Sequence, residues 1–168
     1  MALNDSSLTA SARMAYGLGY LGLLPFLISA LVLGNAAVFG LGSQSASLAG
    51  FYAPYVFVSY SVVILSFVSG TLWGRIHSEG VDKLSSSMLL FSNVVCLSAW
   101  FSLLLTHVSQ VMTLLALILL AIGYGSVLFV ERFAGRDELS YWRLRRNLTI
   151  AVISLHALVL SFIGMEYL

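Results

Sequence analysis

The chain has 168 residues, of which 60% are hydrophobic and only 9% charged, and its mean hydropathy is +0.97. A soluble domain carries about a quarter charged residues, so this composition excludes an ordinary water-soluble protein and indicates an integral membrane protein. With a net charge of +1 and no basic soluble surface, the chain also lacks the features of a nucleic-acid-binding protein.

Five long apolar runs follow a short polar tail and predict an all-α bundle of five transmembrane helices. Because each crossing needs about 20 residues, the whole chain, 1–168, forms a single membrane domain. All eight Lys and Arg residues lie before the first run or in the second and fourth connections, which predicts a cytoplasmic N-terminus and an outside C-terminus. The expected spans are approximately residues 14–38, 54–74, 88–105, 110–130 and 148–167.

Span one carries Gly17, Gly22 and Pro25 in its first part. Proline removes a helical hydrogen bond and bends or breaks a helix, and lipid tolerates this only where neighbouring groups bond the freed backbone. We therefore expect this part of span one to pack inside protein.

Span two carries Ser66, Gly70 and Gly74 at four-residue spacing. Small residues at this spacing let helix backbones approach closely, so this face is expected to contact another helix rather than lipid. The short turn between spans three and four predicts an antiparallel pair of neighbouring helices.

The fourth connection, residues 131–147, is strongly charged. Its second half, 139–147, mixes aromatic residues, leucines and arginines, which favours an interfacial amphipathic segment. Together with the end of span two it supplies a candidate head-group site, because arginines bind phosphate or carboxylate with two hydrogen bonds. The same residue types also follow from the positive-inside rule and the aromatic belt, so both interpretations stay open. The candidate residues are Trp73, Arg75, Tyr141, Trp142, Arg143, Arg145 and Arg146.

His156 lies near the middle of span five, where an ionisable side chain is costly and is a functional candidate. The alternative is a structural role, in which a neutral imidazole bonds across helices to Asn93 or to a backbone carbonyl. His77, His107 and His156 lie at three different depths, so we expect neither a haem nor a metal, and no cofactor. No catalytic signature is present, and we expect a protein that is not an enzyme.

Three ordered segments resemble a family of small five-span membrane proteins of bacteria and mitochondria that is known only as a domain of unknown function. The segments are Leu18–Phe26, Ser66–Gly74 and Trp142–Thr149. The resemblance implies residence in the bacterial inner membrane, or in the mitochondrial inner membrane for a eukaryotic protein. It selects Pro25, Trp73, Gly74, Arg145 and Thr149 as pattern positions, and we expect these segments to converge.

The leading functional hypothesis is an accessory subunit that associates with a larger membrane complex, plausibly respiratory, through glycine-rich helix faces. Its partners are then other membrane subunits and, at the arginine-rich face, anionic lipids. The alternative is a module that binds a lipid or a quinone at the head-group residues. A transporter that uses His156 is the third hypothesis, and the scarcity of ionisable groups inside the spans argues against it.

Overall fold

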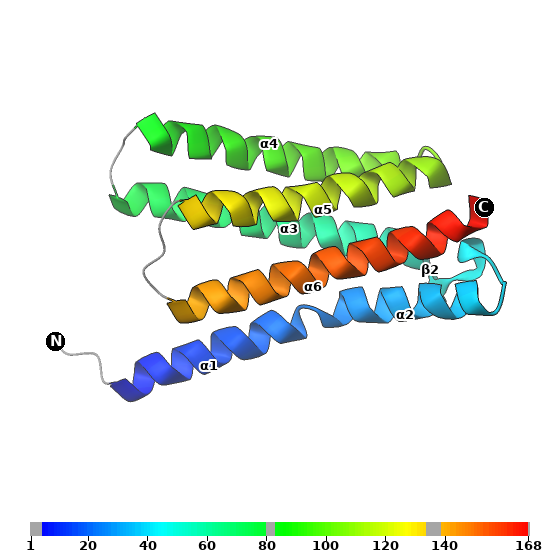
Figure 1. Ribbon diagram of the computed structural model, residues 1–168, viewed down its shortest axis with the longest axis horizontal. Coiled ribbons are helices and arrows are strands. Elements are labelled where there is room, and N and C mark those ends of the chain that lie inside the picture. The colour runs from blue at the N-terminus through cyan, green and yellow to red at the C-terminus, as the bar shows by residue number, and fades with distance from the viewer. Residues whose placement is uncertain (1–4, 80–82, 134–138, 168) are drawn as a thin grey trace.

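The computed structural model describes the backbone of residues 5–79, 83–133 and 139–167, and the side chains of residues 13–72, 86–133 and 141–166. Six α-helices run along the molecule, the first two end to end and the other four beside them (Figure 1). They are α1 (Asp5–Leu21), α2 (Leu24–Val38), α3 (Ala53–Glu79), α4 (Lys83–Leu105), α5 (Gln110–Phe133) and α6 (Leu139–Gly164). Two 3-10 turns, η1 (Ser43–Ser45) and η2 (Met165–Tyr167), and two short strands, β1 (Ser47–Leu48) and β2 (Phe51–Tyr52), complete the described part.

Within the described residues, five helical stretches are long and apolar enough to cross a membrane, which confirms the predicted fold class. They are Arg13–Val38, Ala53–Leu72, Ser86–Leu105, Gln110–Phe133 and Tyr141–Gly164. One feature differs from expectation. The segment 139–147, expected as a separate interfacial piece, forms the first turns of α6 without a break, because no glycine or proline separates it from span five.

Helices α3 and α5 lie at the centre of the bundle and contact each other. Helix α4 packs against both on one side, while α2 and α6 pack on the other side (Figure 1). Helices α3 and α5 pack tightly at Gly123, where an added Cβ would lie 2.6 Å from Leu65 Cδ2. Only a residue without a Cβ therefore fits there without a shift of Leu65.

The first span is two helices, as the proline predicted. Helix α1 ends at Leu21, and α2 begins at Leu24 with Pro25 in its first turn. Proline suits a first helical turn because the amide hydrogen that it lacks has no partner there. The backbone carbonyl of Gly22, freed at the break, accepts a 3.0 Å hydrogen bond from the Tyr60 hydroxyl of α3. Tyr60 of the neighbouring helix thus supplies the hydrogen bond that this backbone carbonyl could not find in lipid.

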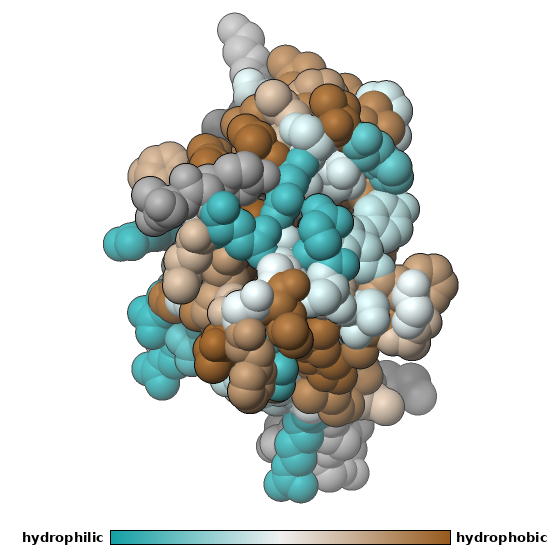
Figure 2. All heavy atoms as spheres, turned by 90° about the vertical axis from the view of Figure 1, so that its right-hand side faces the viewer, coloured by the Kyte–Doolittle hydropathy of each residue, from teal (hydrophilic) through white to brown (hydrophobic). Residues whose placement is uncertain are grey.

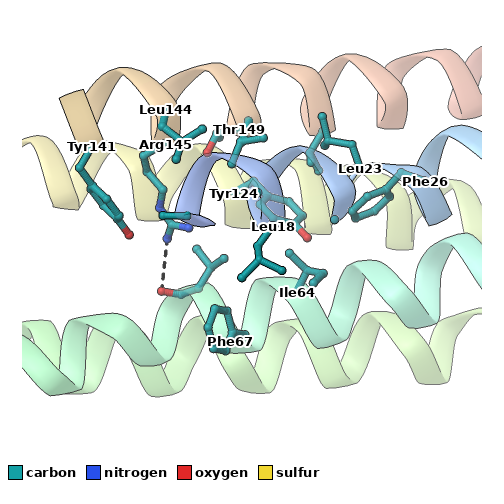
Figure 3. A pocket seen from close by; sticks show the side chains of 16 residues that line it. Leu18, Leu23, Phe26, Ile64, Phe67, Tyr124, Tyr141, Leu144, Arg145 and Thr149 are labelled. Atoms are coloured by element: carbon teal, nitrogen blue, oxygen red, sulfur yellow. Dashed lines mark hydrogen bonds between the residues drawn. The ribbon is translucent and has the colours of Figure 1, made fainter. Parts of the chain in front are cut away.

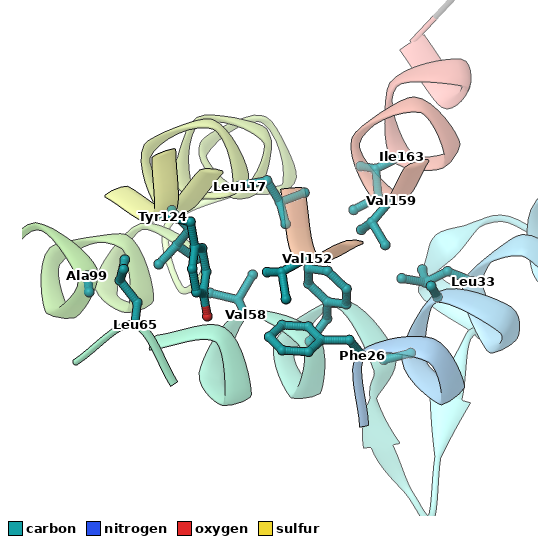
Figure 4. Close-up of a cluster of buried hydrophobic side chains, with 14 of the residues drawn as sticks. Phe26, Leu33, Val58, Leu65, Ala99, Leu117, Tyr124, Val152, Val159 and Ile163 are labelled. Atoms are coloured by element: carbon teal, nitrogen blue, oxygen red, sulfur yellow. The ribbon is translucent and has the colours of Figure 1, made fainter. Parts of the chain in front are cut away.

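A contiguous apolar core fills the space between α2, α3, α4, α5 and α6 (Figure 4). Its largest fully buried side chains include Phe26, Leu33, Phe57, Leu117 and Ile163. Polar side chains tie the helices together across this core. The Ser92 hydroxyl of α4 donates to the Ser69 carbonyl of α3 over 2.9 Å, and the Tyr124 hydroxyl of α5 donates to the Ser61 carbonyl of α3 over 3.0 Å. Such bonds pair polar groups for which lipid offers no hydrogen-bond partner.

The connection between α2 and α3 is ordered by hydrogen bonds to the end of the chain. Strands β1 and β2 pair antiparallel around Ala49 and Gly50, whose φ values of 52° and 84° fit a type I′ turn. The Glu166 carboxylate accepts hydrogen bonds from the Ser43 amide, the Ser43 hydroxyl and the Gln110 side chain. Figure 2 shows this end of the bundle, where hydrophilic side chains gather at the centre of the face. We call it the Glu166 end and the opposite one the Glu131 end.

Candidate functional site

A cavity of about 390 Å³ opens between the helices in the half of the bundle toward the Glu131 end (Figure 3). Its volume lies within the range of about 300–1,000 Å³ typical of small-molecule sites. Leu18, Gly22 and Leu23 line it from α1 and the helix break, and Ile64 and Phe67 line it from α3. Leu18 and Phe67 are also largely exposed, so the cavity opens sideways on a surface that faces lipid in a membrane.

Arg145 of α6 supplies the charged group at the polar end of the cavity. Its Nε donates to Glu131 Oε2 over 3.0 Å, and its Nη2 donates to Glu131 Oε1 over 3.2 Å. The Glu131 side chain is fully buried, while 13% of the Arg145 side chain is exposed. The Nη2 group also lies 3.5 Å from the backbone carbonyl of Val68, the contact drawn as a dashed line in Figure 3. This paired arrangement is the strongest form of a guanidinium–carboxylate contact.

Helix α3 lies beside the Glu131 carboxylate. The Thr71 hydroxyl lies 3.4 Å from Glu131 Oε1 and donates a 2.8 Å hydrogen bond to the Val68 carbonyl. Three helices therefore meet at one ion pair. The pair is electrically neutral as a unit, which lowers the cost of placing two charges near the apolar interior.

Two hydrogen-bonding groups at this end have no partner among the described residues. One is Arg145 Nη1, since the guanidinium contacts use Nε and Nη2. The other is the hydroxyl of Thr149, a residue that is only 6% exposed and lines the cavity. Neither atom is among the buried partnerless atoms of the described residues, which are represented by Ser29 Oγ alone, so both are accessible to a ligand with hydrogen-bond acceptors.

The structure brings two of the seven predicted head-group residues, Tyr141 and Arg145, to the cavity. Trp142 is half-buried, and Arg143 and Arg146 are exposed at the same end of α6. The side chains of Trp73 and Arg75 lie outside the described residues, as does any contact of Gly74. Of the described members of the predicted set, Tyr141 and Arg145 thus line the cavity, whereas Arg143 and Arg146 are exposed.

The segments Leu18–Phe26 and Trp142–Thr149 converge on the cavity, as expected. Gly19 of α1 faces α6 so closely that an added Cβ would lie 2.9 Å from Leu148 Cδ1. Arg145 and Thr149 follow along the same side of α6, and Pro25 begins the helix that carries Phe26 into the cavity wall. The absence of a side chain at Gly19 thus brings α1 against α6 and closes one wall.

His156 is almost completely buried, with 1% of its surface exposed. Its Nδ1 lies 2.8 Å from the Val152 carbonyl, which only accepts, so Nδ1 carries the hydrogen and Nε2 accepts from the Ser61 hydroxyl at 2.9 Å. The Phe57 ring lies against it with a centroid separation of 4.8 Å. Both nitrogens are satisfied, which agrees with the structural role. Asn93, one of the expected partners, instead donates to the Leu89 carbonyl on the exposed side of α4.

The helix-packing predictions hold for some glycines and not for others. Gly22 meets the Tyr60 hydroxyl at 3.8 Å from its ideal Cβ position, whereas Gly17 and Gly70 have no atom within 4 Å of theirs. Ser66 is only partly buried. Of the expected face of span two, Gly70 points away from the bundle, because sequence spacing defines a helix face but not its neighbour. The glycines that pack tightly are Gly19, Gly34 and Gly123.

Glu131 was expected in the fourth connection and not as a site residue. A signal was present, because Leu117, Leu120, Tyr124 and Val127 repeat at three- and four-residue spacing and Glu131 follows in the same register. All five are buried. The apolar face of α5 thus continues to a carboxylate that lies inside the helix and not in the connection that follows it.

Comparison with known proteins gives one match. A family model described as "Protein of unknown function (DUF3429)" covers residues 11–161. No curated protein and no solved structure matches the chain. In the described residues, no group of three or more His, Cys, Asp or Glu is placed to hold a metal ion.

Proposed function

We propose that this chain, which belongs to the family described as Protein of unknown function (DUF3429), is a multi-pass membrane protein that binds a membrane-resident amphiphile. The observation that carries the proposal is the cavity of about 390 Å³ that is apolar along α1 and α3 and ends at Arg145 and Thr149. An amphiphile has the same division into an apolar chain and a polar head. It is a binding role, and it requires no catalytic group.

The lateral opening supports entry from the bilayer. Leu18 and Phe67 flank the cavity and are 64% and 73% exposed, so an apolar chain that lies between them stays in contact with lipid. With the orientation expected from the positive-inside rule, the polar end belongs to the cytoplasmic leaflet of an inner membrane. The chain of the ligand then runs from that leaflet toward the middle of the bilayer.

The test uses two neighbouring residues of α3. Ile64 lines the cavity, whereas Val63 is 62% exposed on the lipid side. Ile64→Trp fills the cavity, and Val63→Trp adds the same side chain outside it. Both variants and the wild type are extracted gently from their own membrane and weighed by native mass spectrometry. The proposal predicts a bound small molecule on the wild type and on Val63→Trp that Ile64→Trp loses. A wild-type chain without any bound molecule contradicts it.

A second proposed function, the accessory subunit, is supported by the outward face of α3. Gly70 has no atom within 4 Å of its ideal Cβ position, so a helix of another protein has room to approach there. Gly70→Leu is then expected to abolish stoichiometric co-purification with partner subunits and to leave the isolated chain folded. Recovery of the wild-type chain as a free monomer in mild detergent contradicts this function.

A further inference from the structure

We infer that the head group taken by the cavity is neutral and carries carbonyl oxygens, as in a quinone or a neutral glycerolipid, and that it is not a phosphate. The inference rests on the proposed function and names the chemistry of its ligand. Two features of the polar end support it: the charge of Arg145 is already compensated, and the groups without partners are hydrogen-bond donors.

The charge balance argues against an anion. Arg145 and the fully buried Glu131 share two hydrogen bonds, so their net charge is zero. A phosphate brought to Arg145 would place a further negative charge close to the Glu131 carboxylate. Charges of like sign at short range in a partly apolar site repel each other strongly, because little water is present to screen them.

The donors argue for an acceptor. Arg145 Nη1 has no hydrogen-bond partner among the described residues. The hydroxyl of Thr149, a cavity-lining residue that is 6% exposed, can also donate and has none either. A carbonyl oxygen accepts such bonds without bringing a charge, and the apolar walls formed by Ile64 and Leu148 suit the chain attached to it.

The exposed arginines require a control. Arg13, Arg132, Arg143 and Arg146 are exposed, and they attract anionic lipids to the surface whatever the cavity prefers. Binding is therefore assigned to the cavity only where Ile64→Trp removes it.

The experiment is a native mass spectrometric titration of the whole purified chain, stripped of endogenous lipid, with three probes. They are decylubiquinone, dioctanoylglycerol and dioctanoyl phosphatidic acid. We expect at least one neutral probe to bind the cavity about tenfold more tightly than phosphatidic acid, because phosphatidic acid would meet Glu131. Preference for decylubiquinone identifies a quinone as the source of the head group, and preference for dioctanoylglycerol identifies a neutral lipid.

Two variants test the assigned groups. Thr149→Val keeps the shape of the side chain and removes its hydroxyl donor. We expect it to lower the affinity for the preferred neutral probe about fivefold, the effect of one net hydrogen bond. Glu131→Gln leaves the charge of Arg145 uncompensated, and we expect it to shift the binding preference of the cavity toward phosphatidic acid. A structural role of either residue predicts no change in this order of preference.

The possible results distinguish a failure of the neutral head group from a failure of amphiphile binding. Cavity binding of phosphatidic acid in preference to both neutral probes overturns the neutral head group and leaves amphiphile binding in place. Unchanged affinity of Thr149→Val for the neutral probe also overturns the assignment of this head group. Absence of any binding that depends on Ile64 overturns the proposed function itself.

Discussion

Glu131, in the last turn of α5, and Arg145, in the second turn of α6, form a two-contact ion pair in which the carboxylate is fully buried. The pair joins the two helices on either side of the fourth connection. It also gives the cavity its polar end without giving it a net charge. The described structure thus uses one arginine of the charged segment inside the bundle, while Arg143 and Arg146 remain exposed.

Arg145→Ala is expected to destabilise the folded chain strongly, because it leaves the Glu131 carboxylate buried without its partner. Removal of one member of a buried pair typically costs about 3–5 kcal/mol. Thermal unfolding in detergent, followed by circular dichroism, measures the loss. The matched control is Arg146→Ala, which removes the exposed neighbouring arginine and should change the Tm little. Equal Tm values for the two variants would contradict the account of the ion pair.

Tyr60→Phe is expected to loosen the helix break. The Tyr60 hydroxyl bonds the Gly22 carbonyl over 3.0 Å, and hydrogen bonds between membrane helices contribute on average about 0.6 kcal/mol. Hydrogen–deuterium exchange should therefore rise in the peptide that contains residues 18–27. Tyr20→Phe removes an exposed phenol of the same type and serves as control. No difference in exchange between the variants would show that the break does not depend on Tyr60.

Gly123→Ala and Gly70→Ala make the same chemical change in two environments. At Gly123 the new Cβ would lie 2.6 Å from Leu65 Cδ2, so overpacking should cost about 1–3 kcal/mol. At Gly70 it meets nothing within 4 Å, and replacement of an open helical glycine by alanine should leave the isolated chain unchanged or slightly more stable. Thermal unfolding measures the stability of both variants, and we expect Gly123→Ala to be the less stable. The reverse order of stability would contradict the α3–α5 packing.

Glu166 makes the Glu166 end sensitive to acid. Burial raises the pKa of the Glu166 carboxyl, but the hydrogen bonds from Ser43 and Gln110 lower it more, so the pKa lies below its ordinary value of 4.5. A carboxyl whose pKa is lowered by folding stabilises the folded form above its unfolded pKa, and this contribution is lost as the pH falls through the folded pKa. Order in residues 42–48 should therefore persist at neutral pH and decrease in acid below 4.5.

The control for this prediction is Glu166→Gln, which cannot titrate. Amide exchange of residues 42–48 in the wild type, divided by that in Glu166→Gln at each pH, removes the intrinsic dependence of exchange on pH. The ratio should rise toward one as the pH is lowered. A ratio that does not change with pH would show that the carboxylate does not order this loop.

The sequence predicted the fold well where one residue type decides the local structure. Pro25 ends one helix and begins the next whatever surrounds it, because its ring prevents the helical hydrogen bond. The five apolar runs likewise mark the spans, since each is long enough to cross a membrane. The convergence of the Leu18–Phe26 and Trp142–Thr149 segments was also expected, and both line the cavity.

The site was less predictable because its chemistry depends on pairs of residues far apart in the sequence. Arg145 was one of five arginines in one connection, and only its contact with Glu131 distinguishes it from Arg143 and Arg146. The partner of His156 is Ser61, one of many serines in the chain, and no local pattern selects it. The outward direction of Gly70 depends on how α3 is rotated in the bundle, which spacing alone does not give.

The measurement that tests amphiphile binding most directly is photolabelling in vesicles of phosphatidylcholine. The probe is a ubiquinone analogue or a diacylglycerol with a diazirine in its chain, and the labelled peptides are identified by mass spectrometry. We predict label concentrated on Leu18–Phe26, on α3 near Ile64 and on α6 near Leu148, and its loss in Ile64→Trp but not in Val63→Trp. Label spread evenly over the exposed face of α4, at Leu97 and Phe101, and unchanged by Ile64→Trp would contradict the account.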